Sequence, residues 1–267
     1  MQGEVVYVCD GGSDGVNVWL FGDAADQPKG GYIKPKEFKA ELLGEGTEAL
    51  NPAENVSPIL IGLAVDYMTR FMSGASAEEA FEISLKGASR MDQEAKASKL
   101  LSGIKGLDER SIVNAVKLVG FDVCFRNGGM GYKPVEEINP DAPTVQNVRT
   151  MVERSLHFFE VYGPKVLDGF SFEGGYTDVV CKGDGDFTTA DTLWDFKVSK
   201  TPIKKEHTLQ LLMYWRMGLH SIHPEFKDVK YLGIYNPRMN TASRIAVGDI
   251  SDEVIEKVEK EVIGYEG

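Results

Sequence analysis

The order of the expected secondary-structure elements predicts an α/β fold that carries a helical insertion and begins with a β-hairpin. Two apolar segments, residues 4–10 and 16–22, flank a glycine-rich run that is typical of a hairpin turn. Helical periodicity dominates residues 57–119. From residue 174 onward, the expected order is strand, strand, helix, strand, strand, helix. This alternation is typical of an α/β domain.

Start and stop signals define the individual elements. The first expected helix has Ser57 as its N-cap and ends at Gly74, and Ser76 with Glu79 forms a capping-box pattern at the start of a second helix that reaches about residue 101. The other expected elements are a helix at 108–119, a strand at 121–126, helices at 143–162 and 204–220, strands at 229–236 and 241–247, and a terminal helix capped by Ser251.

These segments predict one domain over residues 1–267. Residues 1–50 form the hairpin and a long irregular connection, residues 51–120 form a helical block, and residues 121–267 form the core of the domain. The N-terminal and helical segments are candidates for shaping a substrate channel or for binding a protein partner. Neither internal repeats nor low-complexity segments occur in the sequence.

The composition is ordinary for a globular protein, with 42% hydrophobic and 26% charged residues. No apolar run is long enough to cross a membrane, so we expect no membrane span and no secretion. Three scattered cysteines, Cys9, Cys124 and Cys181, indicate small buried residues in a reducing, cytoplasmic compartment. The net charge of −12 argues against tight, non-specific coating of duplex DNA, although a local basic groove can coexist with it.

Residues 174–200 place an acid and a lysine side by side on an expected strand. Strands are expected at 176–181 and 192–198, joined by a polar, glycine-rich connection. Alternation along the second strand puts Asp195 and Lys197 on one face and Trp194 and Phe196 on the other. If the two strands pair as a hairpin, Asp178 points to the same place. The connection also contains three acids that we interpret as solvated turn residues: Asp184, Asp186 and Asp191.

The context of this triplet distinguishes it from similar ones. An acid-x-Lys triplet alone carries little information, because five occur in the sequence. Only Asp195 and Lys197 lie within an expected strand that follows another acid-bearing strand. The next expected helix carries Gln210 and Tyr214, four residues apart and therefore on one face.

A further acid lies far upstream, in the first expected helix. Asp66 is one helical turn beyond Gly62 and one turn before Arg70. It either forms a surface ion pair with Arg70 or reaches the same site as the strand acids, and both interpretations stay open.

Two carboxylates beside an ammonium group suit metal-dependent hydrolysis of phosphodiesters. Mg²⁺ prefers carboxylate oxygens and waters, and one or two carboxylates can hold it. Asp178 and Asp195 would be its ligands, with the main-chain carbonyl of Phe196 as an additional one. Lys197 would orient or deprotonate the attacking water. Gln210 would hold that water or Lys197, and Tyr214 would contact a phosphate or a base at the rim.

These residues resemble the core of the PD-(D/E)xK nucleases. The matching pieces are Gly175-x-x-Asp178, Asp195-Phe196-Lys197 and Gln210-x-x-x-Tyr214. The last of them is similar to the RecB-type exonuclease branch, in which a QxxxY helix follows the catalytic strand. The upstream Gly62-x-x-x-Asp66 resembles the first motif of that branch, Gly-x-x-x-His, with Asp in place of His.

The resemblance implies a restriction-endonuclease-like core, in which helices flank a mixed central sheet. It also implies dependence on Mg²⁺ or Mn²⁺, exonuclease-like hydrolysis of DNA, and metal ligation by Asp66, Asp178, Asp195 and the Phe196 carbonyl. The four-cysteine set that holds an iron–sulfur cluster in some relatives does not occur in the sequence, so we expect no such cluster.

Two alternative hypotheses about the function are also compatible with the sequence. The chain could be a catalytically inactive nucleic-acid-binding or scaffold protein of the same fold. It could also be an unrelated α/β protein in which Asp178 and Asp195 are ordinary strand acids, Lys197 is their ion-pair partner, and Gln210 and Tyr214 lie on a helix surface.

Overall fold

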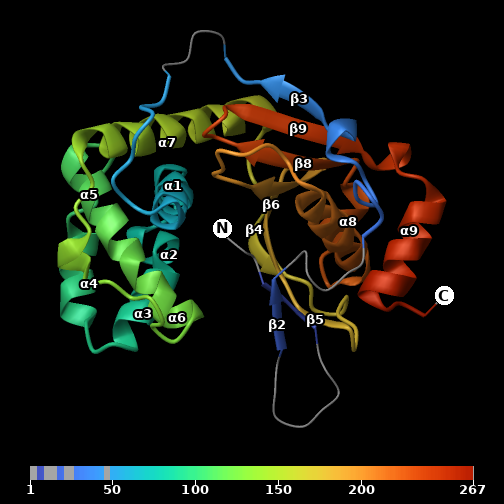
Figure 1. Cartoon of the computed structure of the whole chain (residues 1–267), viewed down its shortest axis with the longest axis horizontal. Coiled ribbons are helices and arrows are strands. Elements are labelled where there is room, and N and C mark those ends of the chain that lie inside the picture. Colours follow the sequence, from blue (N-terminus) through green and yellow to red (C-terminus); the bar gives the residue numbers. More distant parts are fainter. Residues whose placement is uncertain (1–4, 9–16, 21–26, 45–48, 267) are drawn as a thin grey trace. The chain divides into compact units, whose positions relative to one another are not determined.

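The computed structural model describes residues 5–8, 17–20, 27–44 and 49–266, the first two ranges by their backbone alone. The chain divides into two compact units (Figure 1). We call residues 44–158 the helical unit, and residues 2–43 together with 159–267 the α/β unit. The helical unit therefore extends to residue 158, beyond the expected end of the helical block at residue 120.

The helical unit contains several short helices and one long one. Ser76 and Glu79 form the predicted capping box, with the Glu79 amide donating to Ser76 Oγ at 3.1 Å. The helices are α1 (Pro58–Met72), α2 (Ala77–Ala80), α3 (Glu82–Ser89), α4 (Glu94–Ser102), α5 (Glu109–Leu118), η2 (Val119–Phe121), α6 (Asp122–Arg126), η3 (Val135–Glu137) and most of α7 (Ala142–Tyr162).

Two expectations for this unit were wrong. The single helix expected from residue 76 to about 101 is three helices, and Asp92, with φ of +53°, adopts a left-handed conformation between the last two. The strand expected at 121–126 is the short helix α6. Its alternating pattern was misleading because Asp122, which should face solvent in such a strand, is 1% exposed and hydrogen-bonded inside the unit.

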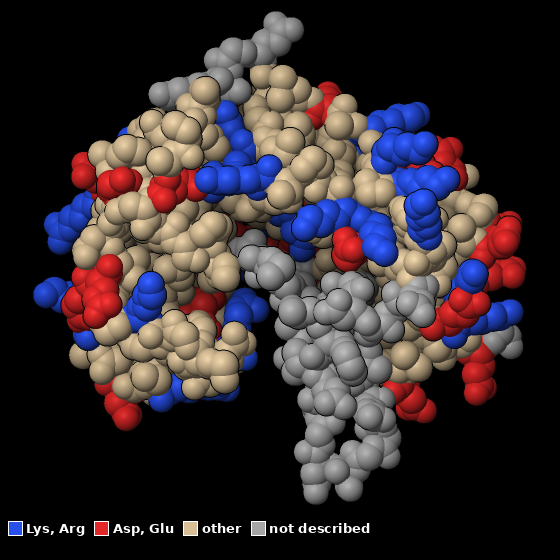
Figure 2. Space-filling view, viewed as in Figure 1, with Lys and Arg blue, Asp and Glu red and all other residues tan. Residues whose placement is uncertain are grey.

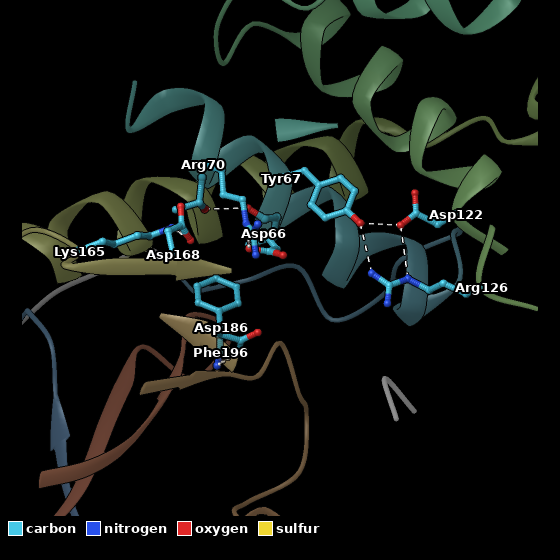
Figure 3. A network of polar contacts seen from close by, with 11 residues as sticks. Asp66, Tyr67, Arg70, Asp122, Arg126, Lys165, Asp168, Asp186 and Phe196 are labelled. Atoms are coloured by element: carbon cyan, nitrogen blue, oxygen red, sulfur yellow. Dashed lines mark hydrogen bonds and ion pairs between the residues drawn. The ribbon is translucent and has the colours of Figure 1, made fainter. Parts of the chain in front are cut away.

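A buried carboxyl network fastens α6 to its neighbours. Asp122 accepts hydrogen bonds from the Tyr67 hydroxyl at 2.6 Å and from the Ser84 hydroxyl at 2.5 Å, and Arg126 Nε lies 3.7 Å from the same carboxylate (Figure 3). Burial raises the pKa of Asp122, and these three partners oppose that shift. Burial, with the charge of Asp122, also raises the pKa of Tyr67.

The α/β unit is built around a mixed six-stranded sheet, which confirms the predicted α/β class. Neighbouring strands are antiparallel except β7 and β8, which are parallel and connected through α8 (Lys205–His220). The strand order is β3 (Lys39–Leu42), β9 (Thr241–Ala246), β8 (Tyr231–Asn236), β7 (Thr192–Phe196), β6 (Asp184–Thr188) and β4 (Leu167–Ser171).

Helices and a small second sheet complete the unit. Figure 1 shows α8 beside the large sheet, with α9 (Asp252–Val258) on the outer side of α8. The second sheet has the order β2 (Asn17–Leu20), β1 (Val5–Val8) and β5 (Val180–Lys182). Short helical turns occur at η1 (Pro35–Glu37), η4 (Pro224–Asp228), η5 (Val247–Asp249) and η6 (Glu259–Ile263).

The core of the α/β unit forms where α8 packs on the sheet. The α8 side chains from Leu209 to Trp215 are all buried, because the helix is covered by the sheet and by the C-terminal helices. On the opposite face, the Tyr162 ring at the end of α7 packs edge-on against Trp194, with centroids 4.8 Å apart. β7 is therefore covered on both faces, which explains why its sequence is mostly apolar.

The structure also tests the expectations for the N-terminal hairpin, the segment 23–55 and the cysteines. The β1–β2 pairing confirms the N-terminal hairpin, whose turn at 11–15 lies outside the described residues. The segment 23–55, expected to be irregular, contains the edge strand β3. The interpretation of the cysteines as small buried residues is confirmed for Cys124, which is free and buried. It was wrong for Cys181, which is half-buried and disulfide-bonded, and Cys9 lies outside the described residues.

Membrane spanning was not expected from the sequence. Among the described helices, none combines the length and apolarity that a bilayer crossing requires.

Candidate active site

The hairpin of β6 and β7 carries two acids, Asp186 and Asp195. Phe187 pairs with Trp194 and Thr188 pairs with Leu193. The pairing ends at Phe187 and Trp194, and beyond it the Asp186 carboxylate lies against the backbone of Phe196, the residue after Asp195. Residues 189–191 form the tight connection, closed by a hydrogen bond of 2.9 Å from the Thr189 amide to the Thr192 carbonyl.

Asp186 is held in place by the backbone of β7. Its Oδ2 atom accepts a hydrogen bond of 2.6 Å from the Phe196 amide (Figure 3). The amide and carbonyl of one strand residue point toward the same neighbouring strand. The Phe196 carbonyl is therefore directed to the β6 side, where Asp186 lies, as its expected role of an additional oxygen ligand requires.

Asp195 and Lys197 form a buried ion pair at the end of β7. Lys197 Nζ lies 3.0 Å from Asp195 Oδ1, and the two side chains are 10% and 3% exposed. The Lys197 amide donates to the Tyr235 carbonyl on β8 at 2.9 Å, which fixes the backbone just beyond the strand. The pair predicted from the alternation of β7 is therefore present, and it is shielded from water.

Asp178 does not lie on the strand next to β7. The expected strand at 176–181 is reduced to β5, which pairs with β1, and Asp178 is an exposed residue of the bend before it. The expected hairpin between 176–181 and 192–198 was therefore wrong, and β6 takes the place beside β7.

Sequence reasoning missed Asp186 because its strand is unusual in composition. Residues 183–186 alternate glycine and aspartate before Phe187, and both residue types are depleted in strands. The interpretation of Asp186 as a solvated turn residue was wrong, because it lies on β6 and is half-buried. The available signal was spacing: only residues 189–191 separate this run from β7, a typical hairpin length.

The glycine at position 185 has a steric role. A Cβ atom there would lie 2.4 Å from ring atoms of Phe170, which is itself buried on β4. β6 can thus approach β4 closely only with glycine at this position. The glycine-rich sequence that obscured the strand is a requirement of its packing.

Gln210 and Tyr214 lie inside the α/β unit. Both come from α8, and they are 4% and 2% exposed. The Tyr214 ring packs against Phe172 with centroids 4.8 Å apart, and it lies 3.4 Å from the position that a Cβ of Gly183 would take. The expectation that Tyr214 reaches the rim of the site was wrong, and so was the alternative that the two residues lie on a helix surface. Tyr214 packs beside the start of β6, and Gln210 is buried on the same helix.

Asp66 belongs to the helical unit, on α1. Its Oδ1 atom accepts a hydrogen bond of 3.2 Å from Arg70 Nε, and the two side chains are 28% and 26% exposed. The structure therefore contains the ion pair that was one of the two interpretations of this residue. Ligation of a metal by Asp66 stays a prediction.

The donor set of the hairpin suits a hard divalent cation. Among the residues that the structure describes, no group of three or more His, Cys, Asp or Glu side chains is arranged to hold a metal. Two carboxylates and a main-chain carbonyl are nevertheless the oxygen donors that Mg²⁺ accepts when phosphate and water complete its coordination. The set contains neither thiolate nor imidazole, so it fits Mg²⁺ or Mn²⁺ better than zinc.

Comparison with known proteins gives no relative: no family model, no curated protein and no solved structure matches this chain.

Proposed function

We propose that this protein is a metal-dependent nuclease that hydrolyses DNA phosphodiester bonds in an exonuclease-like manner. One observation carries the proposal. The Asp186 carboxylate is held 2.6 Å from the amide of Phe196, the residue between Asp195 and Lys197, and the Lys197 ammonium lies 3.0 Å from Asp195. The resemblance to the PD-(D/E)xK nucleases supports the proposal with one change, since Asp186 replaces Asp178 as the first strand acid.

Each residue has a role that its position allows. A bound Mg²⁺ or Mn²⁺ supplies a water of lowered pKa and positive charge beside the scissile phosphate. Asp186 and Asp195 hold the cation, and the Phe196 amide keeps the Asp186 carboxylate in a fixed orientation. Lys197, held by Asp195, positions the attacking water and the phosphate oxygens. Tyr214 supports the start of β6 from α8.

Cleavage assays on four variants test the proposal. Labelled single- and double-stranded DNA is incubated with Mn²⁺ and the wild-type protein, Asp186→Asn, Asp195→Ala, Lys197→Ala or Asp178→Asn. We expect the first three substitutions to lower the rate at least about a hundredfold, because each removes a preorganised group at the reacting centre. Asp178→Asn is the matched control, an exposed acid eight positions before Asp186, and it should retain wild-type activity.

A metal-binding readout makes the outcome independent of turnover. At about a hundredfold excess over its Kd, Mn²⁺ should stabilise the wild-type α/β unit by about 2.7 kcal/mol. The same addition should not stabilise Asp186→Asn. DNA that stays intact, or cleavage that survives both Asp195→Ala and Lys197→Ala, contradicts the proposal. Binding of DNA without cleavage would instead support the inactive, DNA-binding alternative.

A further inference from the structure

A groove of about 290 Å³ lies next to the candidate active site, within the α/β unit. One wall comes from η1 and the residues after it, including Lys36 and Phe38. The other wall comes from the loop between β7 and α8, including Thr201 and Ile203, and the ends of β8 and β9 close the groove near Met239. Its volume is at the lower limit of small-molecule sites, about 300 Å³, which suits one nucleotide rather than an oligonucleotide.

The charge of this groove is opposite to that of the chain. The protein has 41 acidic and 29 basic side chains, yet the described residues that line the groove include no aspartate or glutamate. Lys36 and His207 line it, together with Lys197, whose charge is paired with Asp195. Figure 2 shows lysine and arginine side chains gathered on the side of the α/β unit that holds η1 and β3. A local positive potential in a negative protein favours an anionic ligand.

Neighbouring basic residues come from two segments that pack together. The Thr208 hydroxyl on α8 donates to the Ile33 carbonyl at 2.7 Å, and a Cβ on Gly31 would lie 2.8 Å from Lys205. The segment before η1 is therefore fixed against the start of α8. Lys36 lines the groove, and four further lysines are close in sequence to its lining residues: Lys34, Lys200, Lys204 and Lys205.

The polar side of the groove is preformed. Asn236 donates from Nδ2 to the Ser199 carbonyl at 2.8 Å and accepts the Arg238 amide at 3.0 Å, which fastens the β7–α8 loop to the end of β8. The hydroxyls of Ser199 and Thr201 lie 2.9 Å apart. A site ordered before its ligand arrives loses less conformational entropy on binding.

The groove is continuous with the ion pair of the candidate site. Lys197 lines the groove, and its Nζ atom lies 3.0 Å from Asp195 Oδ1. A ligand bound in the groove would therefore contact Lys197, one of the residues that we assign to catalysis. Two apolar side chains of the groove, the half-buried Ile203 and the 42% exposed Met239, offer a surface for a flat ring.

We infer that this groove binds one nucleoside monophosphate unit. The phosphate lies at Lys36 and the Ser199 and Thr201 hydroxyls, and the base lies against Ile203 and Met239. Its role in the reaction rests on the proposed function: the groove would hold the terminal nucleotide of a DNA strand while the adjoining bond is hydrolysed. The binding itself requires neither cleavage nor metal.

Calorimetric titration of the full chain with deoxyadenosine 5′-monophosphate in EDTA tests the inference. We expect saturable binding that Lys36→Glu weakens about tenfold, since a charge-assisted contact is replaced by repulsion. Lys39→Glu is the matched control. Lys39 is also exposed, lies three residues away and does not line the groove, so its substitution changes the net charge equally. It should leave the affinity within about twofold.

A second variant and two smaller ligands complete the test. Thr201→Trp fills the groove from an exposed loop position and should also weaken binding about tenfold, with unchanged tryptophan-detected unfolding as the folding check. Inorganic phosphate and deoxyadenosine alone should each bind at least about tenfold more weakly than the nucleotide. Equal affinities for Lys36→Glu and Lys39→Glu, or phosphate binding as tight as nucleotide binding, would overturn the inference.

The experiments distinguish a wrong groove inference from a wrong proposed function. If Mn²⁺-dependent DNA cleavage occurs while the nucleotide does not bind in EDTA, the groove inference is wrong and the proposed function stands. If the nucleotide binds with the expected pattern of variants while DNA stays intact, the groove inference is supported and the proposed function is wrong.

Discussion

Removing one partner of the Asp195–Lys197 ion pair should strongly destabilise the α/β unit. At 3.0 Å the gross attraction is about 5–6 kcal/mol with an effective dielectric constant of about 20. Both side chains are at most 10% exposed, so water can screen little of it. Breaking a buried pair costs about 3–5 kcal/mol because one charge stays behind unpaired. We therefore expect Asp195→Leu and Lys197→Met each to lower the unfolding free energy by about that amount.

The two single substitutions should differ in a defined direction. Lys197→Met leaves the buried Asp195 carboxylate without its ammonium partner, while Asp186, a second negative charge, stays bound to the Phe196 amide at the same end of β7. Asp195→Leu instead removes one of those carboxylates, which relieves repulsion. Lys197→Met should therefore be the more destabilising of the two. The double variant loses both charges and should lie within about 1 kcal/mol of the wild type, because apolar replacements of a buried pair are often neutral.

Tryptophan fluorescence during urea denaturation is a suitable assay. All three tryptophans, Trp19, Trp194 and Trp215, belong to the α/β unit, so the signal reports the unfolding of that unit alone. The slope of free energy against urea should be the same for all four proteins, which permits comparison of their midpoints. The double-mutant cycle then gives the coupling energy directly.

Two results would refute this reasoning. Additive effects of the two substitutions would show that the residues do not stabilise each other in the folded protein. Single substitutions that cost less than about 1 kcal/mol would show that water reaches the pair, as it does for surface ion pairs.

Three further predictions concern other parts of the chain. Burial raises the pKa of Asp122, so its contribution to stability is present below the ordinary aspartate pKa and is lost as pH rises through the raised value. Circular dichroism should thus show the helical unit weakening with rising pH in that window, and Asp122→Asn should remove the dependence. Gly185→Ala should lower the unfolding free energy of the α/β unit by about 1–3 kcal/mol, since the new Cβ meets the buried Phe170 ring; unchanged stability would contradict this contact. Tyr162→Phe removes a hydrogen bond of 2.7 Å to Glu41 and should cost about 0.5–1.5 kcal/mol in the same urea assay, whereas Glu41→Gln, which keeps an acceptor, should cost less.

Local signals predicted much of the secondary structure. The helices at 58–72, 109–118, 142–162 and 205–220 have long apolar periodicity or clear caps, and the strands β7, β8 and β9 lie within the predicted segments. These elements were predictable because each one is specified by residues within its own length. The α/β class followed from their order along the chain.

The strand partners of β7 were not specified locally. Two segments precede it, and the one with the better strand composition, 176–181, is engaged by β1 at residues 5–8. That pairing joins segments about 170 residues apart, and the sequence of either one says nothing about it. The poorer segment, rich in glycine and aspartate, becomes β6 because it is adjacent to β7 and because Gly185 allows it to approach Phe170. Tertiary packing overrode strand propensity at this point.

The change from Asp178 to Asp186 makes the candidate site more local than the sequence suggested. Asp186, Asp195 and Lys197 all belong to one hairpin and its end, so their geometry depends on a short connection at 189–191 and on the support of α8. A site of this kind does not need the bend at residue 178 to be ordered. Whether Asp66 also ligates the metal can then be tested separately, because Asp66 belongs to the other unit and has Arg70 as an ion-pair partner. Loss of cleavage in Asp186→Asn with full cleavage in Asp66→Asn would place the complete metal site in the α/β unit. Loss in both would require the helical unit to supply a ligand.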